Sequence, residues 1–172
     1  GDDNSGTAIN NGPLVADGGI PVGDAKYKSY QYTPMNPYMG GANTLADVAM
    51  KYWKTDLRTD LANNVPSDYS TTASDNNKTD RDPAFWQHMV TFTISIGLKT
   101  TRGWSSISDV AIPPSSWPAT GDNLAGNLDD LLHAAVNSRG TFVSASNPQA
   151  FADGLEAALA KYAELPVDEI KA

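Results

Sequence analysis

The chain contains no cysteine, which excludes a disulfide framework, a thiol nucleophile and any zinc site built on thiolates. It also lacks a run of the roughly 18 to 20 continuous apolar residues that a membrane-spanning helix needs. Basic residues are few, with 12 Lys and Arg against 20 Asp and Glu, and the net charge of −8 opposes binding to phosphate backbones. We therefore expect no membrane span and no nucleic-acid partner.

The residues that are present suffice for one domain, because domains commonly span about 100–200 residues and this sequence has 172. A hydrophobic fraction of 40% permits a core, whereas 14 Gly and 11 Pro indicate much irregular loop. Residues 1–43 are rich in Gly, Asn, Asp and Pro without persistent helical or strand periodicity, and we interpret them as an irregular lead-in with a short extended piece around Tyr27 to Tyr32. Two polar or Pro-rich stretches, 62–82 and 99–125, are predicted to be surface loops.

The segment "NTLADVAMKYWKTDL" predicts the first helix. Thr44 and Asp47 have the spacing of a capping box, so Thr44 is interpreted as a helix cap rather than a metal ligand. Apolar residues recur at helical spacing and form one stripe: Leu45, Val48, Ala49, Tyr52 and Trp53. We expect this stripe to be the buried face of the helix.

Residues 90–98 alternate between bulky apolar and small or hydroxylated side chains, which predicts a β-strand. The bulky side consists of Val90, Phe92, Ile94, Ile96 and Leu98, and the first four of these are expected to fill the deeper layer of the protein. The small side is expected to let a helix approach closely. Just before this strand, Asp82 and Pro83 favour an N-cap and a first helical position, which predicts a short helical turn.

The last third of the chain predicts a helix over 127–139, a strand over 141–145 and a final helix. Gly140 is expected to end the first of these helices, and Ser146-Asn147-Pro148 to cap the second. The apolar side of the final helix comprises Phe151, Leu155, Ala158, Leu159 and Tyr162.

The order of strand, helix and strand predicts two parallel strands joined by a right-handed crossover, and hence the α/β class. Parallel sheets are normally built from more than two strands. Either the lead-in 1–43 supplies further strands or partner strands precede residue 1, and we favour the second interpretation.

Three consecutive segments resemble the PilC/PilY family, the type IV pilus tip-associated adhesins and biogenesis factors of bacteria. They read "NTLADVAMKYWKTDLR", "FWQHMVTFTISIGL" and "LLHAAVNSRGTFVSASNPQAFADGLEAAL". The resemblance covers about half of the chain. It implies a von Willebrand factor A-like, and so Rossmann-like, parallel sheet flanked by helices, with long irregular loops.

On this resemblance the whole of 1–172 is a single domain, in which 44–172 form the carboxyl-terminal half of a von Willebrand A-like domain. The metal-binding motif D-x-S-x-S of such domains does not occur in this sequence. The resemblance therefore implies that the metal-ion-dependent adhesion site would lie before residue 1.

Calcium is the cation that the polar loops suit best, because it takes clustered oxygen ligands. Asp75, Asn77 and Thr79 fit the first, third and fifth positions of an EF-hand-like loop. However, Asp80 replaces the usual Gly and Trp86 replaces the bidentate Glu. We interpret the loop as solvated and expect no cofactor, and a divalent cation at these residues is the alternative.

Support for an enzyme is thin. The two histidines are His88, at the start of the strand, and His133, in a helix one turn from Asp129 and Asp130. A general base needs a partner within hydrogen-bond reach, and no serine lies in a G-x-S-x-G elbow. We therefore expect no catalysis, with a hydrolase based on His133 as a remote alternative.

Aromatic residues in the irregular segments could serve adhesion by stacking on sugars or partner proteins. They are Tyr27, Tyr30, Tyr32, Tyr38, Trp104 and Trp117. For each one, we favour the interpretation that the ring pins its loop onto the core.

The resemblance implies a non-catalytic part of a type IV pilus tip protein that acts in fimbrium biogenesis and in surface or host-cell adhesion. The alternative is a Mg²⁺- or Ca²⁺-dependent ligand-binding module of the von Willebrand A type. Expected partners are minor pilins, a host-surface ligand and the rest of the same larger chain. The expected location is extracellular, at the bacterial surface.

Overall fold

The computed structural model describes residues 44–54, 57–58, 60–61, 65–68, 81–110 and 117–163. Its elements, in chain order, are α2 (Leu45–Lys54), β1 (Thr93–Ile96), the 3-10 helix η2 (Ile107–Val110), α3 (Gly126–Asn137), β2 (Phe142–Ala145) and α4 (Pro148–Ala163). This order confirms the predicted succession of helix, strand, helix, strand and helix. The predicted lead-in, 1–43, lies outside the described residues.

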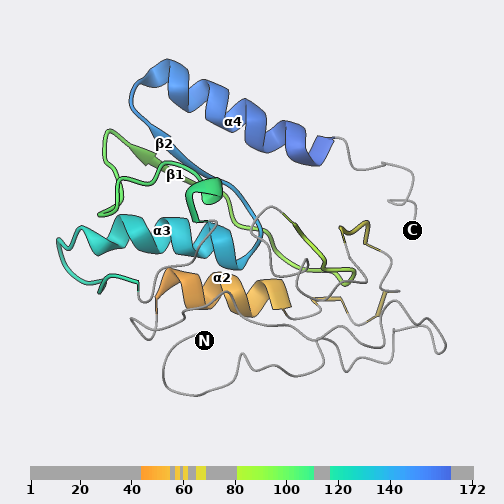
Figure 1. Ribbon diagram of the computed structural model, residues 1–172. Coiled ribbons are helices and arrows are strands. Elements are labelled where there is room, and N and C mark those ends of the chain that lie inside the picture. The colour runs from red at the N-terminus through yellow and green to blue at the C-terminus, as the bar shows by residue number, and fades with distance from the viewer. Residues whose placement is uncertain are drawn as a thin grey trace.

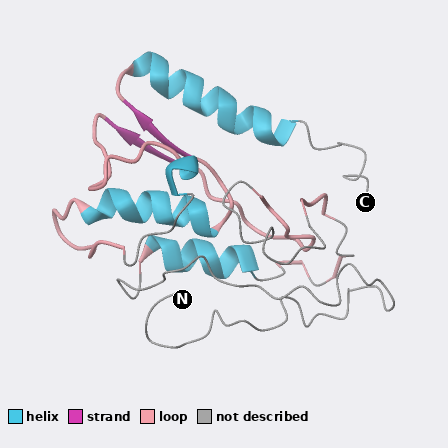
Figure 2. Ribbon diagram, viewed as in Figure 1, coloured by secondary structure: helices cyan, strands magenta, loops and turns pink. Residues whose placement is uncertain are grey.

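The two strands are parallel, with Thr93 opposite Phe142 and Ile96 opposite Ala145. Helix α3 covers one face of this pair and α4 the other, while α2 packs on the side of α3 that faces away from the sheet (Figure 1). Figure 2 shows the same layering by element type. The mixed α/β arrangement agrees with the predicted class, and the described part of the sheet has two strands. No helix among the described residues is long and apolar enough to cross a membrane.

The two sides of β1 are only partly as predicted. On the small side Thr93 and Ser95 are buried, and the Thr93 hydroxyl donates a hydrogen bond of 2.8 Å to the Leu131 carbonyl of α3. The predicted close approach of a helix is therefore confirmed. The prediction for the bulky side is wrong, because Phe92 is 40% and Ile96 70% exposed. The described elements cover this side only in part.

The buried face of α2 also differs from the predicted stripe. Ala46, Ala49, Met50 and Trp53 are buried, whereas Leu45, Val48 and Tyr52 are exposed. Ala46 and Ala49 pack with Ala134 of α3 in one buried cluster. Small side chains allow two helices to approach closely, and this contact selects the alanine side of α2 rather than the larger residues beside it.

Helix α3 ends at Asn137, two residues before the end of the predicted range, in a Schellman motif. Arg139, with φ of 61°, takes the left-handed position expected for Gly140. The N–H groups of Arg139 and Gly140 donate to the carbonyls of Val136 and Ala135 at 3.2 and 2.8 Å. Gly140 is required for another reason, because a Cβ there would overlap the carbonyl oxygen of Thr91.

One buried hydrophobic cluster lies between α3, β2 and the loop after β1. Its buried members are Val110, Trp117, Leu132, Ala135, Val136 and Phe142, with Trp104, Ile107 and Leu131 packed against them. The rings of Trp104 and Trp117 meet edge to face at 6.0 Å. Both tryptophans thus pin their loop to the core, as favoured from the sequence, while the four tyrosines lie outside the described residues.

The start of α4 is as predicted, since the Asn147 side chain accepts the N–H of Ala150 at 2.9 Å. Its apolar side is not fully buried. Ala158 is buried, but Phe151, Leu155 and Leu159 are 38%, 42% and 64% exposed. The side chain of Tyr162 lies outside the described residues. Gly154 faces Val143 so closely that even a Cβ would collide with it, which brings α4 onto β2.

The helical turn predicted after Asp82 is wrong, because residues 83–88 contain no helix. Asp82 accepts the N–H of Ala84 at 3.2 Å, two residues on, in the manner of an Asx turn rather than of an N-cap. Its carboxylate also contacts the side chains of Trp53 and His88.

Candidate functional site

A buried cluster of polar and aromatic side chains joins the end of α2 to the segment before β1. The indole N–H of Trp53 donates to Oδ1 of Asp82 at 3.1 Å, and the indole N–H of Trp86 donates to the Trp53 carbonyl at 2.8 Å. The two indole rings meet edge to face at 5.5 Å. The cluster also contains His88, whose ring lies 6.2 Å from Trp53 and 6.0 Å from Trp86.

Both ring nitrogens of His88 face acceptors. Nδ1 lies 2.7 Å from the carbonyl oxygen of Trp86, and Nε2 lies 3.0 Å from Oδ2 of Asp82. A neutral imidazole has one N–H, so only the imidazolium can donate to both. Burial lowers the pKa of His88, but the hydrogen bond and charge of Asp82 and the Trp86 carbonyl more than offset it, so the pKa is raised. This geometry favours the protonated, positively charged form of His88.

We expect stability to depend on the charge of His88. Because its pKa is raised in the folded protein, its contribution is fully present below the unfolded pKa of about 6.5 and is lost as pH rises through the folded value. Urea unfolding followed by tryptophan fluorescence across this pH range should show the loss. The variants His88→Gln and Asp82→Asn should both flatten the curve. An unchanged slope in both variants would contradict the charge assignment.

The fully buried Arg139 also belongs to this cluster. Its guanidinium lies 5.0 Å from the centre of the Trp53 ring, and its Nη1 donates to the Val136 carbonyl at 3.3 Å. A cation over an indole face is an attractive contact. Trp53 is therefore held between α3 and the segment before β1, which is a role in packing.

The second histidine, His133, occupies a different environment. Its ring stacks on Trp117, with centroids 4.1 Å apart and planes 7° from parallel. Asp129 accepts the backbone N–H and the hydroxyl of Thr101 at 2.8 and 2.9 Å. The two carboxylates expected beside His133, Asp129 and Asp130, thus bind other parts of the chain.

Asp130 caps α2 across 85 positions of sequence. Its carboxylate accepts the N–H groups of Leu45 and Ala46 at 2.8 and 3.2 Å. One of the two hydrogen bonds of the predicted capping box is present, because the Asp47 carboxylate accepts the Thr44 N–H at 3.0 Å. These contacts satisfy N–H groups that a helix start leaves unpaired. Thr44 lies at the helix start, as predicted for a cap.

The predicted cation ligands Asp75, Asn77 and Thr79 lie outside the described residues, so the calcium alternative stays a prediction. Within the ranges that the structure describes, no group of three or more His, Asp or Glu could hold a metal ion.

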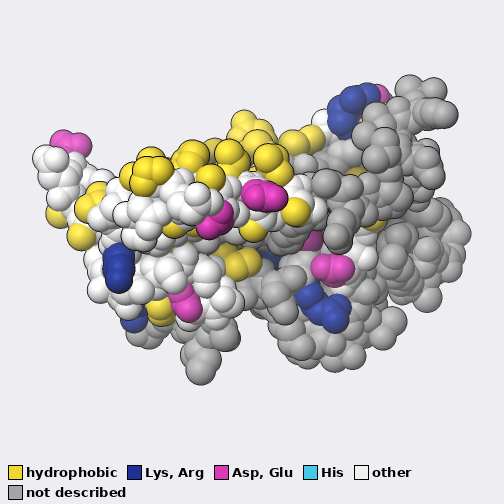
Figure 3. Space-filling model, turned by 90° about the horizontal axis from the view of Figure 1, so that it is seen from above, with side chains coloured by type: hydrophobic (Ala, Val, Ile, Leu, Met, Phe, Trp, Pro, Cys, Tyr) yellow, Lys and Arg dark blue, Asp and Glu magenta, His cyan; other side chains and the backbone are white. Residues whose placement is uncertain are grey.

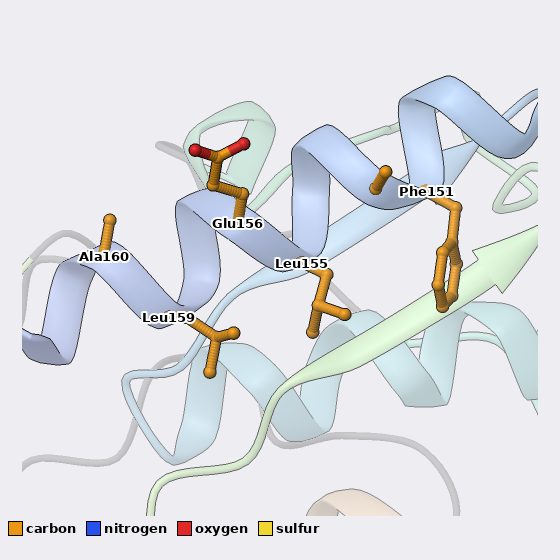
Figure 4. A pocket seen from close by; sticks show the side chains of 6 residues that line it. Phe151, Leu155, Glu156, Leu159 and Ala160 are labelled. Atoms are coloured by element: carbon orange, nitrogen blue, oxygen red, sulfur yellow. The ribbon is translucent and has the colours of Figure 1, made fainter.

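An apolar groove runs along α4 on the described part of the surface. A cavity of about 180 Å³ lies between α4 and the bulky side of the sheet, lined among others by Phe92, Ile94, Val143 and Leu155. A second hollow of about 490 Å³ continues along α4 past Phe151 and Leu159. Figure 4 shows Phe151, Leu155 and Leu159 projecting from one side of α4, with Glu156 on the opposite side. Most residues that line the two hollows are apolar, and Glu156 is the one carboxylate among them, so the groove suits an apolar partner segment.

Comparison with curated proteins places the chain among bacterial type IV pilus biogenesis factors, and it belongs to the PilC/PilY family. It is 39% identical over 132 residues, 68% of its length, to the type IV pilus biogenesis factor PilY1 of Pseudomonas aeruginosa strain PAK, and equally so to that of strain PAO1. The PilY1 of strain UCBPP-PA14 is 35% identical over 150 residues, 77% of the chain.

The chain spans only 11% to 13% of the length of these relatives. No family model matches it, and no solved structure matches it. The family assignment made from the three sequence segments is confirmed by these relatives.

Sequence reasoning found neither the buried cluster nor the apolar groove. Asp82 and Trp53 lie 29 positions apart, and periodicity gives no information on such a pairing. The "DPAFWQH" run did contain a signal, because two aromatic rings, an Asp and a His within seven residues are unusual for a surface turn.

Proposed function

We propose that this chain is a non-catalytic scaffold within a type IV pilus tip protein, where it acts in pilus biogenesis and surface adhesion. The observation that carries the proposal is the 39% identity to PilY1 proteins over 132 residues. Those relatives are named as pilus biogenesis factors, and this chain corresponds to about a tenth of their length. The proposed location is the bacterial cell surface, with pilus proteins as partners.

We also propose that the scaffold is the carboxyl-terminal half of a von Willebrand A-like domain. Its support is the layer order, with parallel strands β1 and β2 between α3 on one face and α4 on the other (Figure 1). Doubly covered parallel sheets are the architecture of that fold class.

The proposal of a scaffold rather than an enzyme is supported by the roles of the ionisable groups. Asp82 joins the cluster around Trp53, Asp129 anchors the loop at Thr101, and Asp130 caps α2. His88 makes two hydrogen bonds within the fold. Each of these groups is occupied in holding segments together, which is a structural use of charge.

The test is complementation of a bacterium that lacks its pilus tip protein. Full-length protein without residues 44–163 is expected to restore neither sheared surface pilin nor adhesion to host cells, whereas the intact protein restores both. Equal pilin yield from the deletion variant would overturn the proposed role in biogenesis.

A chelator distinguishes the proposed scaffold from the alternative function, a cation-dependent ligand-binding module. If the protein were a cation-dependent ligand-binding module, EDTA would abolish adhesion of cells that carry intact pili. On the scaffold proposal, EDTA leaves that adhesion unchanged.

A further inference from the structure

The loop after β1 contains a tightly bonded turn, Thr100–Gly103. The N–H of Gly103 donates to the carbonyl of Thr100 at 2.9 Å and closes the turn, and Gly103 has φ of 74°. The hydroxyl of Thr100 also donates to the carbonyl of Trp104 at 3.1 Å. Both central residues of the turn are exposed. The turn therefore holds them at the surface in a defined backbone geometry.

A buried carboxylate anchors this turn to α3. The backbone N–H and the hydroxyl of Thr101 both donate to the Asp129 carboxylate, at 2.8 and 2.9 Å. Asp129 is fully buried in the first turn of α3. Hydrogen bonds to an ionised acceptor are stronger than those between neutral groups, so the two bonds fix the turn in place. An exposed loop fixed in this way is preorganised for recognition, because it has little freedom to lose on binding.

Two basic residues, Lys99 and Arg102, lie on either side of Thr101 in this loop, and both are exposed. The guanidinium of Arg102 lies 5.4 Å from the centre of the Trp104 ring. That ring is held in turn by its packing against the core and by its edge-to-face contact with Trp117. The contact with Trp104 partly orders the Arg102 side chain in advance. A guanidinium has five N–H donors in a planar fork that matches the geometry of a carboxylate.

These two cations stand out in a chain with a net charge of −8. Lys99 has no ion-pair partner among the residues that the structure describes. Asp109, an exposed carboxylate of the same loop, accepts the N–H groups of Ser105 and Ser106 at 2.7 and 3.0 Å. The carboxylates that contact this loop thus bind its backbone and the Thr101 hydroxyl, which leaves a surface of positive charge at the turn.

This surface is separate from the apolar groove along α4. None of residues 99–104 lines either hollow of the groove. On the face seen from above in Figure 3, hydrophobic side chains form a row, and the few described Lys and Arg side chains lie outside that row. A partner of the basic turn would therefore be recognised by its charge and not by burial in the groove.

We propose that Lys99 and Arg102 form a preorganised binding site for an acidic segment of another protein. The Arg102 fork binds one carboxylate, and the Lys99 ammonium binds a second. Leu98, which is 59% exposed, contacts an apolar residue of the same segment. Complementary charge of this kind provides specificity and speeds association. The proposal rests on the proposed function only in taking the acidic partner to be a pilus protein.

The experiment measures binding of a fluorescein-labelled peptide of alternating Glu and Leu residues to the full-length protein. Fluorescence anisotropy is the readout, and EDTA is present so that no bound metal ion contributes. Arg102→Glu reverses one charge of the site. Lys51→Glu is the matched control, because Lys51 is exposed and lies 5.8 Å from the centre of the Tyr52 ring, an arrangement like that of Arg102 and Trp104.

Arg102→Glu is expected to weaken peptide binding by about tenfold or more, whereas Lys51→Glu changes it by about twofold or less. Arg102→Lys should have an intermediate effect, because an ammonium lacks the planar fork. Equal effects of charge reversal at the two positions would overturn the proposal. Absence of measurable peptide binding by the unsubstituted protein would also overturn it.

Asp129→Asn tests the preorganisation of the turn. The substitution removes a negative charge near the site, so attraction by charge alone would strengthen peptide binding. Because Thr101 loses an ionised acceptor, the proposal predicts binding that is weaker by about threefold or more. Thr101→Val, which removes one hydrogen bond without changing the charge, should act in the same direction and guards against a misfolded Asp129 variant. Unchanged or stronger binding in both variants would contradict the proposed site.

Heparin in place of the peptide distinguishes a protein partner from an anionic sugar. The expected result is weaker binding of heparin than of the peptide. Tighter binding of heparin that depends on Arg102 would overturn the assignment to a protein segment. Peptide binding by a protein that is dispensable for surface pilin would contradict only the proposed function.

Discussion

Trp53→Ala is expected to lower the free energy of unfolding by about 3–5 kcal/mol, the range for loss of a buried aromatic side chain. Trp53 is fully buried, stands edge to face with Trp86 and lies beneath the guanidinium of Arg139. Its removal leaves a cavity and deprives Asp82 of an indole donor. Urea unfolding of the full-length protein, followed by hydrogen exchange of the α3 and β2 amides, measures the effect.

The neighbouring Tyr52→Ala is the matched control. Tyr52 is 40% exposed on the same helix, so its loss should cost about 1 kcal/mol or less. The sequence pattern assigned both residues to one buried stripe. Equal losses from the two variants would therefore support the sequence stripe and contradict the orientation of α2 described above.

Gly140→Ala is expected to destabilise the domain by about 3 kcal/mol, because the added methyl group is forced against backbone. A Cβ at Gly140 would overlap the carbonyl oxygen of Thr91 and press on Val90. The chain that leads into β1 would have to move away from the end of α3. Hydrogen exchange of the β1 and β2 amides in the full-length protein reports this opening.

Gly97→Ala is the control that separates the steric collision at residue 140 from the cost of replacing a glycine. Gly97 has φ of 72° and nothing within 4 Å of a built Cβ, so its substitution costs only the left-handed backbone, about 1–2 kcal/mol. A Gly140→Ala effect no larger than that of Gly97→Ala would show that the strand entry does not pack against residue 140.

Local signals predicted the elements well. The alternation over 90–98 contains β1, the prediction of 141–145 contains β2, and Asn147 caps α4. These features depend on residues within a few positions of one another, which is where capping and periodicity act.

The orientation of the elements was less predictable, because it depends on partners distant in sequence. Leu45 and Val48 have the spacing of a buried face, yet the alanine side of α2 meets Ala134. The bulky face of β1 had the pattern of a core layer, but Ile96 is 70% exposed. Apolar periodicity identifies the apolar face of a helix or strand but gives no information on which element covers that face.

The buried cluster shows the same limit at the candidate site. His88 and Asp82 are close in sequence, whereas Trp53 joins them only through tertiary packing. The raised pKa of His88 depends on two acceptors at hydrogen-bond distance, which no spacing rule supplies.

Surface pilin yield across variants of graded stability tests the central claim that this chain acts as a folded scaffold in pilus biogenesis. The full-length protein would carry Tyr52→Ala, Gly97→Ala, Trp53→Ala or Gly140→Ala in a strain without its own copy. The account predicts that sheared surface pilin falls in the order of lost stability, with near-normal yield for Tyr52→Ala and the lowest yields for Trp53→Ala and Gly140→Ala. Normal yield from these last two, with hydrogen exchange showing their fold opened, would contradict it.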